Sequence, residues 1–219
     1  MEHLDANVDL RRHEGHQQSR TRQSESMAPP AAEDATIQSQ GSHRVVRQPR
    51  HLILLQPTMT TSGLEVSVHE CPRTMMRELV HVFPNTLKKD CNVLAVVTNQ
   101  RASVDLAQFG EEADKEKDRL LENFVKWAHE VAEALTAAGH WADFIDPCSG
   151  LPMLALNSNK VYSEVDGVEV LLRYNCLSAG MCKILIHPEW GAAVYPASLF
   201  TTAPSDLVLD IVSKGFVQH

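Results

Sequence analysis

The sequence lacks the short motifs by which several classes of enzyme are recognised. Its 219 residues contain neither G-x-x-x-x-G-K-[ST] nor G-x-G-x-x-G, so neither glycine-rich phosphate-binding loop is present. They also contain no G-x-S-x-G, no H-E-x-x-H and no C-x-x-C. These absences argue against a P-loop NTPase, a dinucleotide-binding Rossmann domain, an α/β-hydrolase and a zincin.

A surplus of positive charge and a long apolar run are missing as well. The formal net charge is −8 and the isoelectric point is about 5.7, so the composition does not favour nucleic acid as a partner. No stretch approaches the roughly 20 apolar residues that a transmembrane helix needs. The hydrophobic fraction of 43% is ordinary for a globular protein. We therefore expect neither a nucleic-acid nor a membrane partner.

Cysteine is scarce and odd in number. The five residues are Cys71, Cys91, Cys148, Cys176 and Cys182. Because the charged opening MEHLDANVDL does not resemble a secretory signal, we expect free thiols in a reducing compartment. Arginines and serines near the start are typical of a mitochondrial presequence, whereas the acidic residues among them are not. The targeting signal is therefore ambiguous between the cytoplasm and the mitochondrion.

Composition divides the chain near residue 50. Residues 1–50 are rich in Gln, Ser, His, Arg and Pro and have few large apolar side chains. Such a segment buries too little apolar area to offset the entropy of ordering, so we predict a disordered N-terminal tail. Residues 51–219 carry regular hydrophobic patterns and are predicted to form one domain.

Within that domain, the hydrophobic periods predict an α+β fold with a mostly antiparallel sheet and flanking helices. The clearest element is a helix over 113–139, where Leu120, Phe124, Ala128, Val131 and Leu135 form one stripe. Two further helices are predicted over 71–83 and 204–215. The predicted strands cover 51–57, 64–70, 91–98, 140–147, 168–177, 182–188 and 192–202.

The stretch GMCKILIHPEWG, residues 180–191, holds the best candidate for chemistry. In a strand, Cys182 shares a face with Ile184 and Ile186, which is typical of a small buried side chain. Yet it directly follows Gly180 and Met181 at the start of the strand, where solvent reaches, and Lys183 beside it favours a thiolate. The residues alone leave both interpretations open.

Other constellations are weaker. Four potential zinc ligands are scattered along the C-terminal half, namely Cys148, Cys176, Cys182 and His187. Their spacings are wider than those of structural zinc sites. Asp143 and Asp146 lie three residues apart in a predicted strand and so point to opposite faces, which makes them poor acid–base partners.

The strings GHWADFIDPCSGL, AGMCKILIHPEWG and ASLFTTA, in this order, resemble the cobalamin trafficking protein CblD family, the methylmalonic aciduria and homocystinuria type D proteins. The resemblance runs from about Leu64 to the C-terminal helix. It implies a flavin-reductase-like or nitroreductase-like scaffold without flavin, and a non-enzymatic adaptor. It further implies a CblC-type cobalamin-processing protein as partner, and transfer of cobalamin toward methionine synthase in the cytoplasm and methylmalonyl-CoA mutase in the mitochondrion. The alternative is a flavin-dependent reductase on the same scaffold.

The resemblance also implies a ligand for cobalt, supplied by a thiolate in a Gly-Cys-Cys-Lys string. This chain reads Gly-Met-Cys-Lys, so Met181 stands where the family's first cysteine stands. A neutral thioether is a weaker partner for cobalt than a thiolate. We predict Cys182 as the cobalt ligand with Met181 beside it, and Cys176 as a second possible thiolate. The rest of the loop, Tyr174, Cys176, Ala179 and Gly180, is predicted to face the partner.

Overall fold

The computed structural model describes residues 51–108, 110–155, 158–180 and 182–215. The tail predicted over 1–50 lies outside the described residues, as does Met181.

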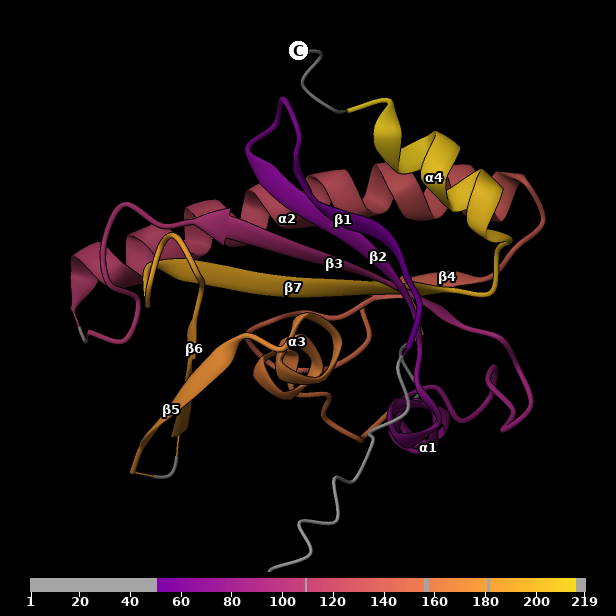
Figure 1. Ribbon diagram of the computed structural model, residues 1–219, viewed down its shortest axis with the longest axis horizontal. Helices are drawn as coiled ribbons and strands as arrows, with labels where there is room; N and C mark the ends of the chain where they lie inside the picture. The colour runs from indigo at the N-terminus through magenta and orange to yellow at the C-terminus, as the bar shows by residue number, and fades with distance from the viewer. Residues whose placement is uncertain (1–50, 109, 156–157, 181, 216–219) are drawn as a thin grey trace, which may run out of the picture. The chain divides into compact units, whose positions relative to one another are not determined.

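The centre of the domain is a five-stranded sheet in the order β1-β2-β3-β7-β4 (Figure 1). All of its neighbouring strands pair antiparallel. The strands are β1 (Ile53–Met59), β2 (Leu64–Glu70), β3 (Leu94–Arg101), β4 (Ala142–Phe144) and β7 (Val194–Thr201). The prediction of an α+β fold with a mostly antiparallel sheet is confirmed.

Four helices cover the two faces of this sheet (Figure 1). Helices α2 (Glu111–Ala137) and α4 (Ser205–Ser213) share a hydrophobic core with Val96 of β3. Helices α1 (Arg73–Val82) and α3 (Glu164–Leu172) share another with the neighbouring Ala95 and Val97. Successive strand residues point to opposite faces, so the two cores lie on opposite sides of the sheet.

Burial on both faces corrects one prediction. The alternation in residues 64–70 predicts a half-buried strand, yet Ser67 and His69 are as buried as Leu64 and Val66. The second face is covered by α1 and α3, which the pattern of β2 alone does not reveal. His69 is held in this setting by a hydrogen bond between its Nε2 and Ser67 Oγ at 2.9 Å.

The strand predicted over 168–177 is wrong in its first half, because residues 168–172 belong to α3, whereas residues 175–177 do lie in a strand. The run VEVLL is β-branched and apolar, so its local preference suggests a strand. Helix signals outweigh it: the Ser163 hydroxyl caps the helix by accepting from the Asp166 amide, and acidic residues occupy the first turn. Val168 and Leu171, three residues apart, are then buried on one face of α3.

A separate two-stranded sheet follows α3. It consists of β5 (Asn175–Ala179) and β6 (Cys182–Ile186), which pair antiparallel. In Figure 1 this hairpin extends away from the five-stranded sheet beside α3. In the described part of the chain, no helix has the length and apolarity needed to cross a membrane.

Candidate functional site at the β5–β6 hairpin

The hairpin places the Gly-Met-Cys-Lys string at its turn. Ala179 pairs with Cys182, so Gly180 follows the last paired residue of β5. Gly180 has φ of +63°, a left-handed conformation that tight hairpin turns require and that glycine adopts without a steric penalty.

Helix α3 holds one side of the hairpin. The Lys183 ammonium donates to Asp166 Oδ1 at 2.6 Å and to Glu169 Oε2 at 3.2 Å. The hydrogen bond to Asp166 contributes most to raising the pKa of Lys183, and Glu169 adds to it. Two residues further along β6, Leu185 is buried in the core beneath α3. An isolated hairpin is marginally stable, so these contacts are needed to hold it in place.

These ion pairs change the role expected of Lys183. The sequence suggests that its charge favours a thiolate at the neighbouring cysteine. In the structure its ammonium is paired with two carboxylates of α3, so its charge is largely neutralised there. Any stabilisation of a thiolate at the turn must therefore come from another source.

The base of the hairpin is anchored by His187, which follows β6 and is buried. Its Nδ1 accepts the amides of Glu189 and Trp190 at 3.2 and 3.3 Å. The ring proton therefore lies on Nε2, which donates to Glu65 Oε1 of β2 at 3.2 Å. Asn99 of β3 donates to the same oxygen at 3.1 Å. This chain of hydrogen bonds connects the hairpin to the central sheet.

Aromatic rings complete the anchor. Trp190 stacks on His187 with ring centroids 3.9 Å apart, and Tyr174, at the start of the hairpin, meets the same ring edge-on at 5.1 Å. Burial, followed by the nearby Glu65 carboxylate, raises the pKa of Tyr174 to about 12. The phenol therefore stays neutral at physiological pH and acts as a packing group.

The predicted site residues are distributed along this hairpin. Tyr174 packs at its base, and Cys176 is half-buried in β5. Gly180 occupies the turn, while Cys182 begins β6. The side chains of Ala179 and Cys182 lie outside what the structure describes. Cys176 and Tyr174 also line an open cavity of about 740 Å³ between β5, α3 and the start of β1.

Cys176 forms a thiolate less readily than the sequence suggests. Burial raises the pKa of its thiol, and the nearby Glu169 carboxylate raises it further. Its Sγ lies 4.0 Å from the carbonyl oxygen of Tyr174, a weak contact that favours the protonated form. The assignment of Cys182 as a metal ligand stays a prediction, because its side chain lies outside what the structure describes.

The four-ligand zinc arrangement does not assemble in the described part of the chain. Both ring nitrogens of His187 are engaged in hydrogen bonds, and no group of three or more metal-binding side chains is found among the described residues. Asp143 is buried and accepts backbone amides from Leu154 and Ala155 at 2.9 and 2.8 Å, so it positions a loop. Asp146 caps a turn by accepting from the Cys148 amide.

Several residues of the site have no signal in the local sequence. Glu65 lies 122 residues before His187, and Asp166 lies 17 residues before Lys183. A carboxylate on a strand or helix is ordinarily a solvated side chain, so nothing marks these two in advance. Their role follows from the way β2, α3 and the hairpin come together.

The protein is thus an α+β domain with a cysteine-containing hairpin. Helix α3 and the central sheet hold this hairpin in place. The chain belongs to the methylmalonic aciduria and homocystinuria type D protein family, whose model matches residues 10–213. This finding confirms the family resemblance described above.

Curated relatives agree with that assignment. The chain is 34% identical to the cobalamin trafficking protein CblD of Rattus norvegicus and of Homo sapiens over 146 residues, which are 67% of this chain and 49% of each relative. It is 33% identical to the protein of the same name from Gallus gallus over 143 residues, or 65% of this chain and 48% of that protein. The chain thus spans about half the length of the curated relatives it matches.

Proposed function

We propose that this protein is a non-enzymatic adaptor in intracellular cobalamin trafficking. It accepts cobalamin from a CblC-type processing protein and routes it toward methionine synthase and methylmalonyl-CoA mutase, in the cytoplasm and the mitochondrion. Membership of the family and the printed names of the relatives support this proposal. The single observation that carries it is the anchored hairpin whose turn bears the Gly-Met-Cys-Lys string.

The chemistry is consistent with a cargo held between two proteins. A thiolate is a soft ligand that suits cobalt at an exposed coordination position. Coordination by the metal itself stabilises the deprotonated form of a thiol. Cys182 therefore serves as a ligand without the help of Lys183, whose charge is already paired with α3. The corrin ring is held chiefly by the processing protein.

The scaffold is proposed to be nitroreductase-like and to have lost its flavin. The alternative function, a flavin-dependent reductase, requires cations to converge on the phosphate of the cofactor. The candidates near the hairpin are Lys160, Arg173 and Lys183, of which Lys183 is committed to Asp166 and Glu169. The adaptor predicts a colourless purified protein, whereas the reductase predicts a yellow one.

An absorption titration tests the cobalt–thiolate bond. The protein is added to the cobalamin-loaded processing protein, and the cobalamin spectrum is recorded for wild type, Cys182→Ser and Met181→Cys. We expect a thiolate-type spectrum in wild type that is lost in Cys182→Ser. Cys148→Ser, which removes an exposed thiol outside the hairpin, is the matched control and should leave the spectrum unchanged.

The outcome for Met181→Cys separates two versions of the proposal. If wild type shows no new spectrum but Met181→Cys does, direct ligation by Cys182 is wrong and the adaptor works through protein contacts alone. If no variant produces a new spectrum and the two proteins do not associate, the adaptor function itself is contradicted.

The hairpin surface yields a second prediction, which concerns the partner. Leu177 on β5 is 58% exposed, an unusual setting for a leucine in a strand beside the proposed ligand. We expect Leu177→Asp to weaken binding of the processing protein by about tenfold or more, because a charge replaces an apolar contact. Val161, which is 57% exposed and lies outside the hairpin, provides the control Val161→Asp. Equal effects of the two changes would argue against a hairpin interface, and isothermal titration calorimetry measures both.

A further inference from the structure

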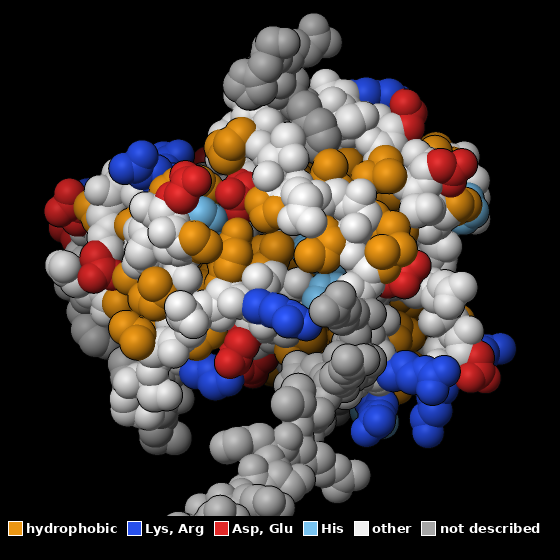
Figure 2. Space-filling view, in the orientation of Figure 1, with side chains coloured by type: hydrophobic (Ala, Val, Ile, Leu, Met, Phe, Trp, Pro, Cys, Tyr) orange, Lys and Arg blue, Asp and Glu red, His pale blue; other side chains and the backbone are white. Residues whose placement is uncertain are grey.

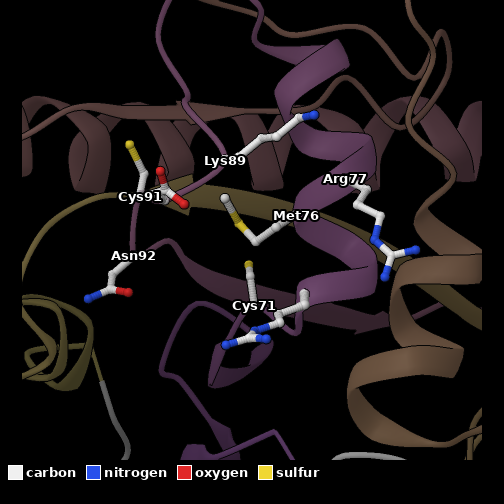
Figure 3. A pocket seen from close by; sticks show the side chains of 8 residues that line it. Cys71, Met76, Arg77, Lys89, Cys91 and Asn92 are labelled. Atoms are coloured by element: carbon white, nitrogen blue, oxygen red, sulfur yellow. The ribbon is translucent and has the colours of Figure 1, made fainter.

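A second site lies at α1, on residues that the proposed function does not use. An open cavity of about 590 Å³ is lined by Arg73, Arg77 and Lys89, with Asp90 as the one acidic residue of the lining. In Figure 3 the sulfur-bearing side chains of Cys71 and Met76 lie between Cys91 on one side and Arg77 on the other.

The positively charged side chains of this cavity lie where they destabilise helix α1. Arg73 is the first residue of α1, at the positive end of the helix dipole, and the first turn contains no acidic residue. Helices α2, α3 and α4 all begin with acidic residues in their first turns. Arg77 lies four residues after Arg73, where two like charges on a helix repel each other. Both arrangements oppose helix stability.

No internal partner compensates for this repulsion. Among the residues that the structure describes, the ion pairs are made by other side chains, and Arg73, Arg77 and Lys89 take part in none of them. Figure 2 shows Lys and Arg side chains gathered at the lower right, where Figure 1 places α1. The patch is positively charged, although the chain as a whole has a net charge of −8.

We propose that this cavity binds a small molecule that carries phosphate groups, of the size of a nucleoside diphosphate. A guanidinium group can donate two parallel hydrogen bonds to the oxygens of one phosphate. Two arginines with one lysine therefore match a ligand with adjacent phosphates. The volume lies within the range of small-molecule sites. Burial raises the pKa of the Cys71 thiol, so this side chain adds no negative charge to that of Asp90. This proposal is independent of the cobalamin function.

Calorimetric titrations with ADP, inorganic pyrophosphate and adenosine test the proposal on the full chain at low ionic strength. We expect ADP and pyrophosphate to bind and adenosine to bind at least tenfold more weakly, since charge-assisted hydrogen bonds to phosphate supply the affinity. The double variant Arg73→Gln/Arg77→Gln should weaken ADP binding by about a hundredfold. Lys126→Gln, which removes an exposed charge from α2, is the matched control and should change it by less than about twofold.

Three results would overturn the proposal. The first is the absence of binding by both ADP and pyrophosphate, and the second is full binding in the double variant. The third is binding of a glutamate-rich peptide, with neither phosphate compound bound, which would make the patch a protein-docking surface instead. Both arginines are exposed, and thermal unfolding of each variant establishes that lost binding is not lost folding.

Discussion

Replacement of Glu164 by glutamine is expected to stabilise the domain on the order of 4 kcal/mol at pH 9 and to change it little at pH 5. Glu164 begins α3 and is buried against β7, where it accepts the Ser198 amide at 3.1 Å and the Ser198 hydroxyl at 2.5 Å. Burial raises the pKa of this carboxyl group to about 8. A glutamine has the shape of the protonated acid and keeps an acceptor for the amide.

The sign of the effect follows from the two states of the protein. In the unfolded chain Glu164 ionises near its ordinary value of 4.5, whereas in the folded domain it stays protonated until about pH 8. Its contribution to stability is therefore complete below pH 4.5 and is lost as the pH rises toward 8, by about 1.4 kcal/mol per pH unit. Glutamine does not titrate, so the variant escapes this loss.

The contribution of His69 to stability depends on pH in the opposite direction, and it determines how stability changes at lower pH. Burial, followed by the nearby His51, lowers the pKa of His69 from 6.5 to about 4. Stability from this residue is lost as the pH falls from 6.5 to 4, because the unfolded chain takes up a proton first. Between pH 4.5 and 6.5 the two residues offset each other, and above 6.5 the fall due to Glu164 remains.

Urea unfolding of wild type and Glu164→Gln at pH 5, 7 and 9 measures this difference directly. The two stability curves should lie close together at pH 5, separate up to about pH 8 and run nearly parallel from there to pH 9. Glu133→Gln changes an exposed glutamate on α2 and should run parallel to wild type. Parallel curves for Glu164→Gln as well would show that the carboxyl group is already ionised in the folded domain at neutral pH.

Replacement of His187 by phenylalanine is expected to release the β5–β6 hairpin from the central sheet. The ring would still stack on Trp190, but the amides of Glu189 and Trp190 and the Glu65 carboxylate would lose a partner. Unpaired buried groups cost about 1–3 kcal/mol each, so we expect a loss of about 3 kcal/mol. Amide exchange in β5 and β6 should then accelerate about a hundredfold or more, with smaller changes in β3.

Glu65→Gln is the matched variant for this experiment. The amide oxygen of glutamine still accepts from His187 Nε2 and from Asn99 Nδ2, so the hydrogen bonds survive the loss of charge. We expect exchange in the hairpin to stay within about threefold of wild type. If His187→Phe leaves the hairpin protected, the contacts of Lys183 with α3 suffice to hold it, and the histidine anchor is wrong.

Much of the fold could be read from periodicity. The stripe of Leu120, Phe124 and Leu135 predicted α2, and the apolar run of residues 91–98 predicted the strand β3. These signals are local, because the period of the pattern reflects the geometry of one element. Residues 168–172 were misassigned for the same reason. The β-branched residues among them favour a strand locally, whereas Ser163 and packing against β7 stabilise a helix.

The candidate site was likewise predictable from the sequence only in part. The sequence by itself determined the family, the antiparallel α+β class and the string at residues 180–183 that draws attention to Cys182. Only the tertiary structure decided that Lys183 is paired with α3, that His187 donates to Glu65, and that Glu164 is buried against Ser198. Patterns report which face of an element is buried. Pairings between side chains as many as 122 residues apart depend on how the elements pack, and no local period records them.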